Sequence, residues 1–148
     1  MKIEIENGKL QQSIDYLFTL KLSRKQSRAR RHLIDQLKER KKRVDADRME
    51  LINEYSKKDS EGNPVVENNI YIMKDQEAFN EAINELNEEK MVIEGGDNRE
   101  MIRTVRRVLR KLIDDEVEYE GIPSETFDYL CDQFKADEDN GGEEGEDK

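Results

Sequence analysis

The sequence predicts a helix-dominated α+β fold: a long helical hairpin, a small three-stranded sheet and a disordered acidic C-terminal tail. Three observations lead to this fold class. An apolar stripe with helical spacing extends from Leu33 to Tyr55, three short segments have the apolar and β-branched residues of strands, and the last residues are acidic and nearly without apolar side chains. At 148 residues the chain fits one domain, which we place at residues 1–135, with the tail at residues 136–148.

The N-terminal half predicts one strand and two helices. Residues 2–6 alternate isoleucine with charged residues, as in a strand with one buried face, and residues 9–20 have the spacing of an amphipathic helix. Ser23 or Ser27 is expected to cap a helix that continues to about Tyr55. Because a helix of about 30 residues is roughly 45 Å long, part of it should project from a small core or pack in a hairpin. Its stripe consists of Leu33, Leu37, Val44, Leu51 and Tyr55.

The second half predicts two strands and three helices. Gly62 and Pro64 mark a turn. Asp75 is the expected cap of the helix that follows the second strand. The sheet is expected to join residues 2–6, 70–73 and 91–94. The predicted helices cover residues 75–89, 98–113 and 124–135.

Composition limits the class of protein. Charged residues make up 42% and hydrophobic residues 34% of the chain, so the core should be modest. The single cysteine, Cys131, excludes an internal disulfide and a multi-cysteine zinc site. The N-terminus lacks the apolar run of a signal peptide, and no stretch approaches the roughly 20 apolar residues of a membrane helix. We therefore expect a soluble intracellular protein.

Charge is segregated along the chain. The net charge is +8 over residues 21–48, −9 over 49–98, +5 over 99–112 and −13 over 113–148, although the whole chain carries −10. The first basic block contains the run from Arg24 to Arg31. This run fits contact with phosphate or with an acidic protein surface, and it equally fits a solvated helix start.

A second arginine row repeats at intervals of three and four residues in the helix predicted at 98–113. This row fits contact with the acidic helix at 75–90 or with another subunit. The acidic tail fits a solubilising end, a mimic of nucleic acid or a segment that occupies the protein's own basic helix. The candidate partner-binding residues are Arg24, Lys25, Arg28, Arg30, Arg31, Arg103, Arg106 and Arg110.

No residue pattern points to a catalytic or metal site. The only histidine, His32, lies in the basic helix, and Cys131 lies on an apolar helix face. Gly95 and Gly96 lack the following Lys-Ser/Thr of a phosphate loop, and the paired acidic residues lack the spacing of a calcium loop. The sequence therefore predicts a protein that is not an enzyme and that holds no cofactor or metal.

Four segments resemble a family of small bacteriophage proteins of unknown function from tailed phages of Gram-positive hosts. They are MKIEIENGKL at residues 1–10, LKLSRKQSR at 20–28, EYSKKD at 54–59 followed by GNP at 62–64, and VIEGG at 92–96. The resemblance covers about residues 1–135 and implies a phage origin and a place among late or tail-region genes. It brings no catalytic residues.

These observations predict a non-enzymatic phage interaction protein, either a minor virion or tail-associated component or an assembly factor. Two alternatives stay open: a small inhibitor of a host or defence protein, and a nucleic-acid-binding accessory protein that uses the basic helix 24–43. The expected location is the host cytoplasm or the virion. The expected partner is a phage structural protein or a host protein rather than a membrane, and self-association stays open.

Overall fold

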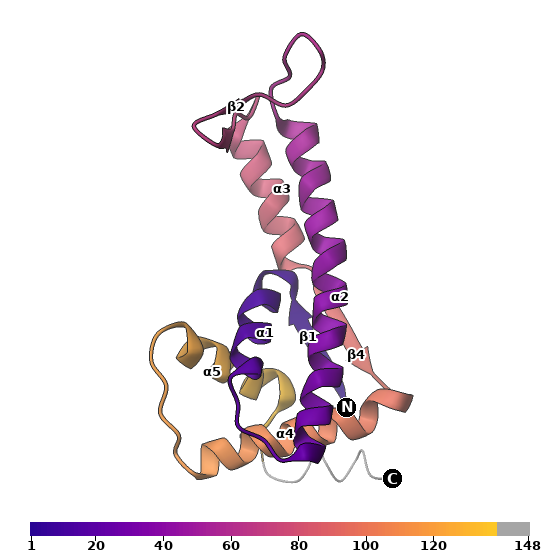
Figure 1. Cartoon of the computed structure of the whole chain (residues 1–148), viewed down its shortest axis with the longest axis vertical. Helices are drawn as coiled ribbons and strands as arrows, with labels where there is room; N and C mark the ends of the chain where they lie inside the picture. The colour runs from indigo at the N-terminus through magenta and orange to yellow at the C-terminus, as the bar shows by residue number, and fades with distance from the viewer. Residues whose placement is uncertain (139–148) are drawn as a thin grey trace.

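The structure, a computed structural model, describes residues 1–138 and confirms the helix-dominated α+β fold (Figure 1). An arm formed by the C-terminal part of α2 and by α3 projects from a base that holds the other long elements. Within the described residues the elements are β1 (Lys2–Glu6), η1 (Asn7–Lys9), α1 (Leu10–Phe18), α2 (Arg24–Tyr55), β2 (Val66–Glu67), β3 (Ile70–Tyr71), α3 (Gln76–Glu88), β4 (Lys90–Glu94), η2 (Gly96–Asn98), α4 (Arg99–Asp114) and α5 (Ile122–Phe134).

The base is built on a two-stranded antiparallel sheet. β1 pairs with β4 so that Ile3 lies opposite Ile93 and Ile5 opposite Met91. Because side chains alternate between the faces of a strand, these residues share one face. Ile3 and Ile5 are fully buried there, against a core to which α1, α2, α4 and α5 contribute. The predicted strand at residues 2–6 is therefore confirmed.

The predicted three-stranded sheet is wrong, because residues 70–73 do not join β1 and β4. β3 pairs instead with β2 in a separate hairpin at the tip of the arm. Asn68 and Asn69 form its two-residue turn at φ of 53° and 65°, a backbone region that asparagine tolerates. The reason is distance: α2 carries the chain about 48 Å at the standard rise, and α3 is needed to bring it back to the base.

α2 begins where its cap predicts. The Ser23 hydroxyl accepts a hydrogen bond from the backbone N–H of Gln26, and the Gln26 side chain accepts one from the backbone N–H of Ser23, which is a capping box. Leu33, Leu37 and Val44 of the predicted stripe are buried. The first half of α2 packs against α1 and α4, and its second half packs against α3 in the predicted helical hairpin.

One buried side chain joins the arm to the base. Asn7, only 5% exposed, donates from Nδ2 to the carbonyl of Leu86 at 2.8 Å and accepts from Arg40 Nε at 2.9 Å. Its backbone N–H also donates to the carbonyl of Glu89 at 2.8 Å. β1, the long helix α2 and the C-terminal end of α3 therefore meet at one residue.

α4 and α5 both end in Schellman motifs without glycine. After α4, Val117 N–H donates to the Leu112 carbonyl and Glu116 N–H to the Ile113 carbonyl, with Glu116 at a φ of 53°. After α5, Lys135 takes the same left-handed conformation, also at a φ of 53°. These caps turn the chain back across the base.

The second of these caps moves the boundary of the expected tail. Ala136, placed in the tail by sequence, is fully buried, and its N–H donates to the Cys131 carbonyl at 2.9 Å. Ala136 therefore belongs to the packed fold, whereas Asp137 and Glu138 are exposed, and the rest of the predicted tail, residues 139–148, lies outside the described residues.

Candidate interaction surfaces

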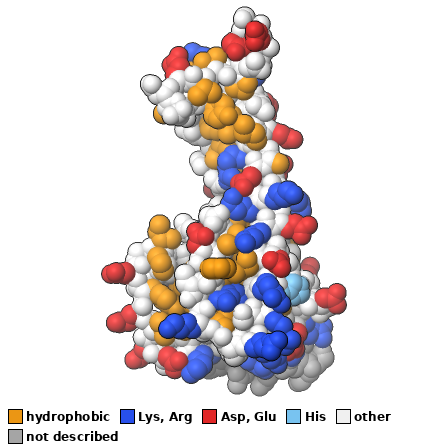
Figure 2. Space-filling model, viewed as in Figure 1, with side chains coloured by type: hydrophobic (Ala, Val, Ile, Leu, Met, Phe, Trp, Pro, Cys, Tyr) orange, Lys and Arg blue, Asp and Glu red, His pale blue; other side chains and the backbone are white. Residues whose placement is uncertain are grey.

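The outward side of α2 carries a row of cations. Arg24, Arg28 and Arg31 are exposed and recur at intervals of four and three residues, which places them on one helix face. At 100° per residue this face is opposite the buried stripe of α2. Figure 2 shows Lys and Arg side chains gathered along α2 toward the base. We call the row the basic face; it consists of the exposed residues Arg24, Arg28, Arg31, Lys38 and Lys42, with Asp35 among them.

The five cations of the basic face form no ion pairs with the described part of the chain. Within residues 1–138, no carboxylate oxygen lies within 4.0 Å of a side-chain nitrogen of its five cations. The predicted residue Lys25 lies beside the face and pairs weakly with Glu100, at 3.7 Å and with both side chains mostly exposed. The positive charge of the face is therefore not neutralised by this part of the fold.

Arg30, also predicted to bind a partner, is engaged inside the fold. Its Nη1 donates to the carbonyls of Leu17 at 3.2 Å and Leu20 at 2.5 Å, at the end of α1. The last carbonyls of a helix lack partners within the helix, so Arg30 acts as a cap for α1. Its spacing from the buried residues Ile34 and Leu37, four and seven positions on, is the sequence signal for this inward position.

The predicted arginines of α4 lie at the foot of the base. Arg106 is 4% exposed and donates from Nη2 to the carbonyls of Lys135 and Glu138, both at 3.0 Å. Arg110 Nη1 donates to the carbonyls of Ala136 at 3.3 Å and Glu138 at 2.8 Å. These two arginines fasten the chain that follows α5 onto α4.

The acidic helix suggested as a partner for this row does not cover it. α3 lies in the arm and α4 at the foot of the base (Figure 1). Arg103, the third predicted arginine of α4, forms an ion pair with Glu100 of its own helix at 3.1 Å. The structure therefore separates the predicted residues. Arg30, Arg106 and Arg110 join segments of the fold, and Arg103 pairs within its own helix. The exposed residues on α2 are Arg24, Lys25, Arg28 and Arg31.

Histidine and cysteine side chains often act in catalysis, and the one residue of each kind in this chain has ordinary surroundings. His32 is exposed and borders a hollow of about 220 Å³ between α2 and the start of α4, together with Lys25 and Arg28. Cys131 is buried, and burial raises the pKa of its thiol to about 12, which keeps it protonated at neutral pH. Among the described residues, no cluster of three His, Cys, Asp or Glu side chains is placed to hold a metal ion.

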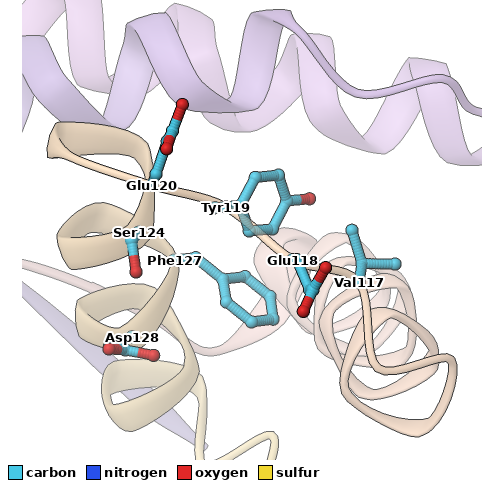
Figure 3. A pocket seen from close by; sticks show the side chains of 7 residues that line it. All are labelled: Val117, Glu118, Tyr119, Glu120, Ser124, Phe127 and Asp128. Carbon is cyan, nitrogen blue, oxygen red and sulfur yellow. The ribbon is translucent and has the colours of Figure 1, made fainter.

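A hollow between α5 and the segment that precedes it was not predicted. It measures about 660 Å³ and is lined by Val117, Tyr119 and Phe127 together with acidic side chains (Figure 3). A second hollow of about 530 Å³ adjoins it and shares Val117 and Phe127. Its acidic residues lie on the connection between α4 and α5 and on α5, so the acidic block of residues 113–148 is the sequence signal for its charge, although nothing local signals the hollow itself.

Comparison with known proteins adds no further assignment. No protein-family model, curated protein or solved structure matches the chain. The resemblance to small phage proteins therefore stays a prediction. None of the helices in the described part of the chain is long and apolar enough to span a membrane.

Proposed function

We propose that this is a non-enzymatic phage interaction protein that binds an acidic surface of a partner protein through the basic face of α2. The observation that carries the proposal is a row of five exposed cations without an ion-pair partner in the described chain. From Arg24 to Lys42 the row is about 27 Å long at the standard helical rise. The phage setting rests on the four resembling segments.

Like charges outnumber opposite charges along the basic face. Arg24–Arg28, Arg28–Arg31 and Lys38–Lys42 place like charges three or four residues apart, each pair costing an isolated helix about 0.2–0.5 kcal/mol, whereas Asp35 lies at favourable spacing from Arg31 and Lys38. Arg24 also lies in the first turn, near the positive end of the helix dipole. A partner with carboxylates along this row would remove both penalties.

The surface favours a protein partner over nucleic acid. No aromatic side chain is interleaved in the row, so it lacks a platform for stacking bases. The net charge of −10 repels a phosphate backbone as it approaches. A compact acidic patch on a protein instead engages the row within the screening length of about 8–10 Å. Nucleic acid is therefore the alternative that the experiment must test.

Charge reversal tests the proposal. The double variant Arg28→Glu/Arg31→Glu changes the basic face, and Lys57→Glu/Lys74→Glu makes the same change in net charge at two exposed residues of the arm. Each protein is used to capture partners from infected-cell lysate and is mixed with labelled duplex DNA at low salt. We expect one stoichiometric acidic protein to be retained by wild type and by the arm variant and lost from the basic-face variant.

Two results would contradict the proposal. One is retention of the same partner by the Arg28→Glu/Arg31→Glu variant, which would place the contact elsewhere. The other is tight, salt-sensitive DNA binding that the same variant abolishes, which would identify nucleic acid as the ligand. Circular dichroism of both variants separates a lost contact from a lost fold.

A further inference from the structure

The two adjoining hollows beside α5 form one groove with an apolar floor. Its floor is made by side chains of α4, of the connection between α4 and α5, and of α5 itself. Val117 and Phe127 line both hollows, so the two are continuous. Val117 is 38% exposed in it, although large apolar side chains of this fold are mostly buried. The apolar lining consists of Leu112, Ile113, Val117, Tyr119, Phe127 and Cys131.

The walls of the groove are held in place. The hydroxyls of Tyr16 and Tyr119 are hydrogen bonded at 2.9 Å, which fixes the connection against α1. The Tyr119 and Phe127 ring centroids are 5.1 Å apart, within the range of favourable aromatic pairs. The Schellman motif at Glu116 fixes the start of the connection. A preformed groove spares a ligand the cost of ordering its site.

The rim of the groove is uniformly acidic. The residues that line the two hollows include six carboxylates and no lysine or arginine. All six are exposed, and none has a Lys or Arg nitrogen within 4.0 Å among residues 1–138. The groove therefore combines apolar contact area with a negative charge that the described fold does not balance. These carboxylates belong to Glu116, Glu118, Glu120, Asp128, Asp132 and Asp137.

From this combination we propose that the groove binds a Lys/Arg-rich amphipathic helix of a partner protein. The α5 residues that line it extend from Ser124 to Asp132, about 12 Å along the helix. Apolar side chains at positions i, i+4 and i+7 of a bound helix span about 10 Å, which matches this length. Basic residues on either side of that stripe meet the six carboxylates. The inference does not depend on the basic face, which lies on another helix.

A second copy of this chain is a poor occupant. Its basic helix presents cations, but the apolar residues in the same half of α2, such as Leu33, Ile34 and Leu37, are buried in the base. That helix therefore has no apolar stripe to place on the floor of the groove. A separate protein that carries both features on one helix fits the groove better.

Designed peptides test the proposal on the full chain. The probe is a labelled helical peptide of about 12 residues with leucines at i, i+4 and i+7 and flanking lysines. One control peptide has the same composition in scrambled order, and a second has glutamate in place of lysine. Fluorescence polarisation should show binding of the probe about tenfold tighter than that of the scrambled peptide, and no binding of the acidic peptide.

Matched variants locate the contact. Glu118→Lys/Asp128→Lys reverses two rim charges, and Glu50→Lys/Glu54→Lys makes the same change at exposed positions of α2 in the arm. We expect the rim variant to weaken probe binding about tenfold and the arm variant to leave it within about twofold. Val117→Ser, which changes no charge, should also weaken binding if the floor is in contact.

Three outcomes would overturn the proposal. Equal binding of the probe and the scrambled peptide would mean that charge alone is recognised. Failure of the probe to bind below about 1 mM would mean that the groove does not take such a helix. Sedimentation showing self-association of the wild type that Glu118→Lys/Asp128→Lys abolishes would assign the groove to a second copy.

Discussion

Replacing Asn7 by alanine should weaken the junction between arm and base. The substitution removes the donor that satisfies the Leu86 carbonyl and the acceptor that faces Arg40 Nε. The Leu86 carbonyl belongs to the last turn of α3, where carbonyls have no partner within the helix. A neutral hydrogen bond contributes about 1 kcal/mol and one to a charged group about 1.5–3 kcal/mol. We therefore expect the free energy of unfolding to fall by about 3 kcal/mol.

Urea denaturation measures this loss. The midpoint should fall with little change in the slope, since the surface exposed on unfolding stays the same. The control is Asn53→Ala, an exposed asparagine of α2 in the arm, for which helix propensity predicts a change of less than about 0.7 kcal/mol in the stabilising direction. A loss below about 0.5 kcal/mol for Asn7→Ala would refute the role of this residue as a junction.

A double-mutant cycle isolates the contact with Arg40. Arg40→Ala alone and Asn7→Ala alone should each destabilise the protein, and the double variant should lose about 1–2 kcal/mol less than the sum of the two. Hydrogen exchange gives an independent reading. In Asn7→Ala the amides of α3 should lose protection more than those of α4, because α3 is the element that the residue anchors.

Three further predictions follow from caps and burial. Ser23→Ala removes the capping box of α2 and should lower the free energy of unfolding by about 1 kcal/mol in urea denaturation; no loss would mean that the cap is dispensable. Glu116→Gly relieves a left-handed residue and should raise the melting temperature, with a stabilisation of up to about 1 kcal/mol; a fall would contradict strain at this site. Burial raises the pKa of the Cys131 thiol from 9.0 to about 12, because the folded state disfavours the charged thiolate. The stability that the buried, protonated thiol contributes is therefore fully present below pH 9 and is lost as the pH rises toward 12. A coloured disulfide reagent at pH 8 should label the thiol only as fast as the protein opens, and rapid labelling without urea would contradict this.

Local chemistry made several elements predictable from the sequence. Ser23 and Asp75 cap the helices that follow them, as their side chains suggested. The alternation of residues 2–6 gave a strand with a buried face because the pattern and the structure share a period of two. Each of these features depends on residues within a few positions of one another.

Features that depend on distant residues or on unusual backbone were missed. Residues 70–73 have the pattern of a strand, but that pattern carries no information on their distance from β1, which the length of α2 sets. Glu116 and Lys135 end their helices in the conformation that normally selects glycine, so a search for glycine does not find these caps. The β2–β3 turn likewise uses two asparagines where Asn-Gly is the stronger signal.

The sequence predicted only part of the candidate surface, because charge along the chain does not show on which side of a helix each residue lies. The run from Arg24 to Arg31 mixes both sides of α2, and Arg30 belongs to the inner side. Arg106 is similarly at the edge of the buried face of α4, between Val105 and Leu109 in sequence. The six carboxylates of the groove all fall within the acidic block of residues 113–148, but its apolar floor joins α4 to α5 and forms only when these helices pack together.

The salt dependence of binding should distinguish the basic face from the groove, the two surfaces whose charge the described fold does not neutralise. The basic face offers a partner only exposed charges, and at 1 M salt the screening length falls to about 3 Å, so binding there should be abolished. The groove adds an apolar floor, and burial of apolar area is not weakened by salt. The Lys-rich probe should therefore keep measurable affinity in 1 M salt, whereas a partner of the basic face should be released. If both contacts vanish together, the apolar floor contributes nothing to binding and the groove is only an acidic surface.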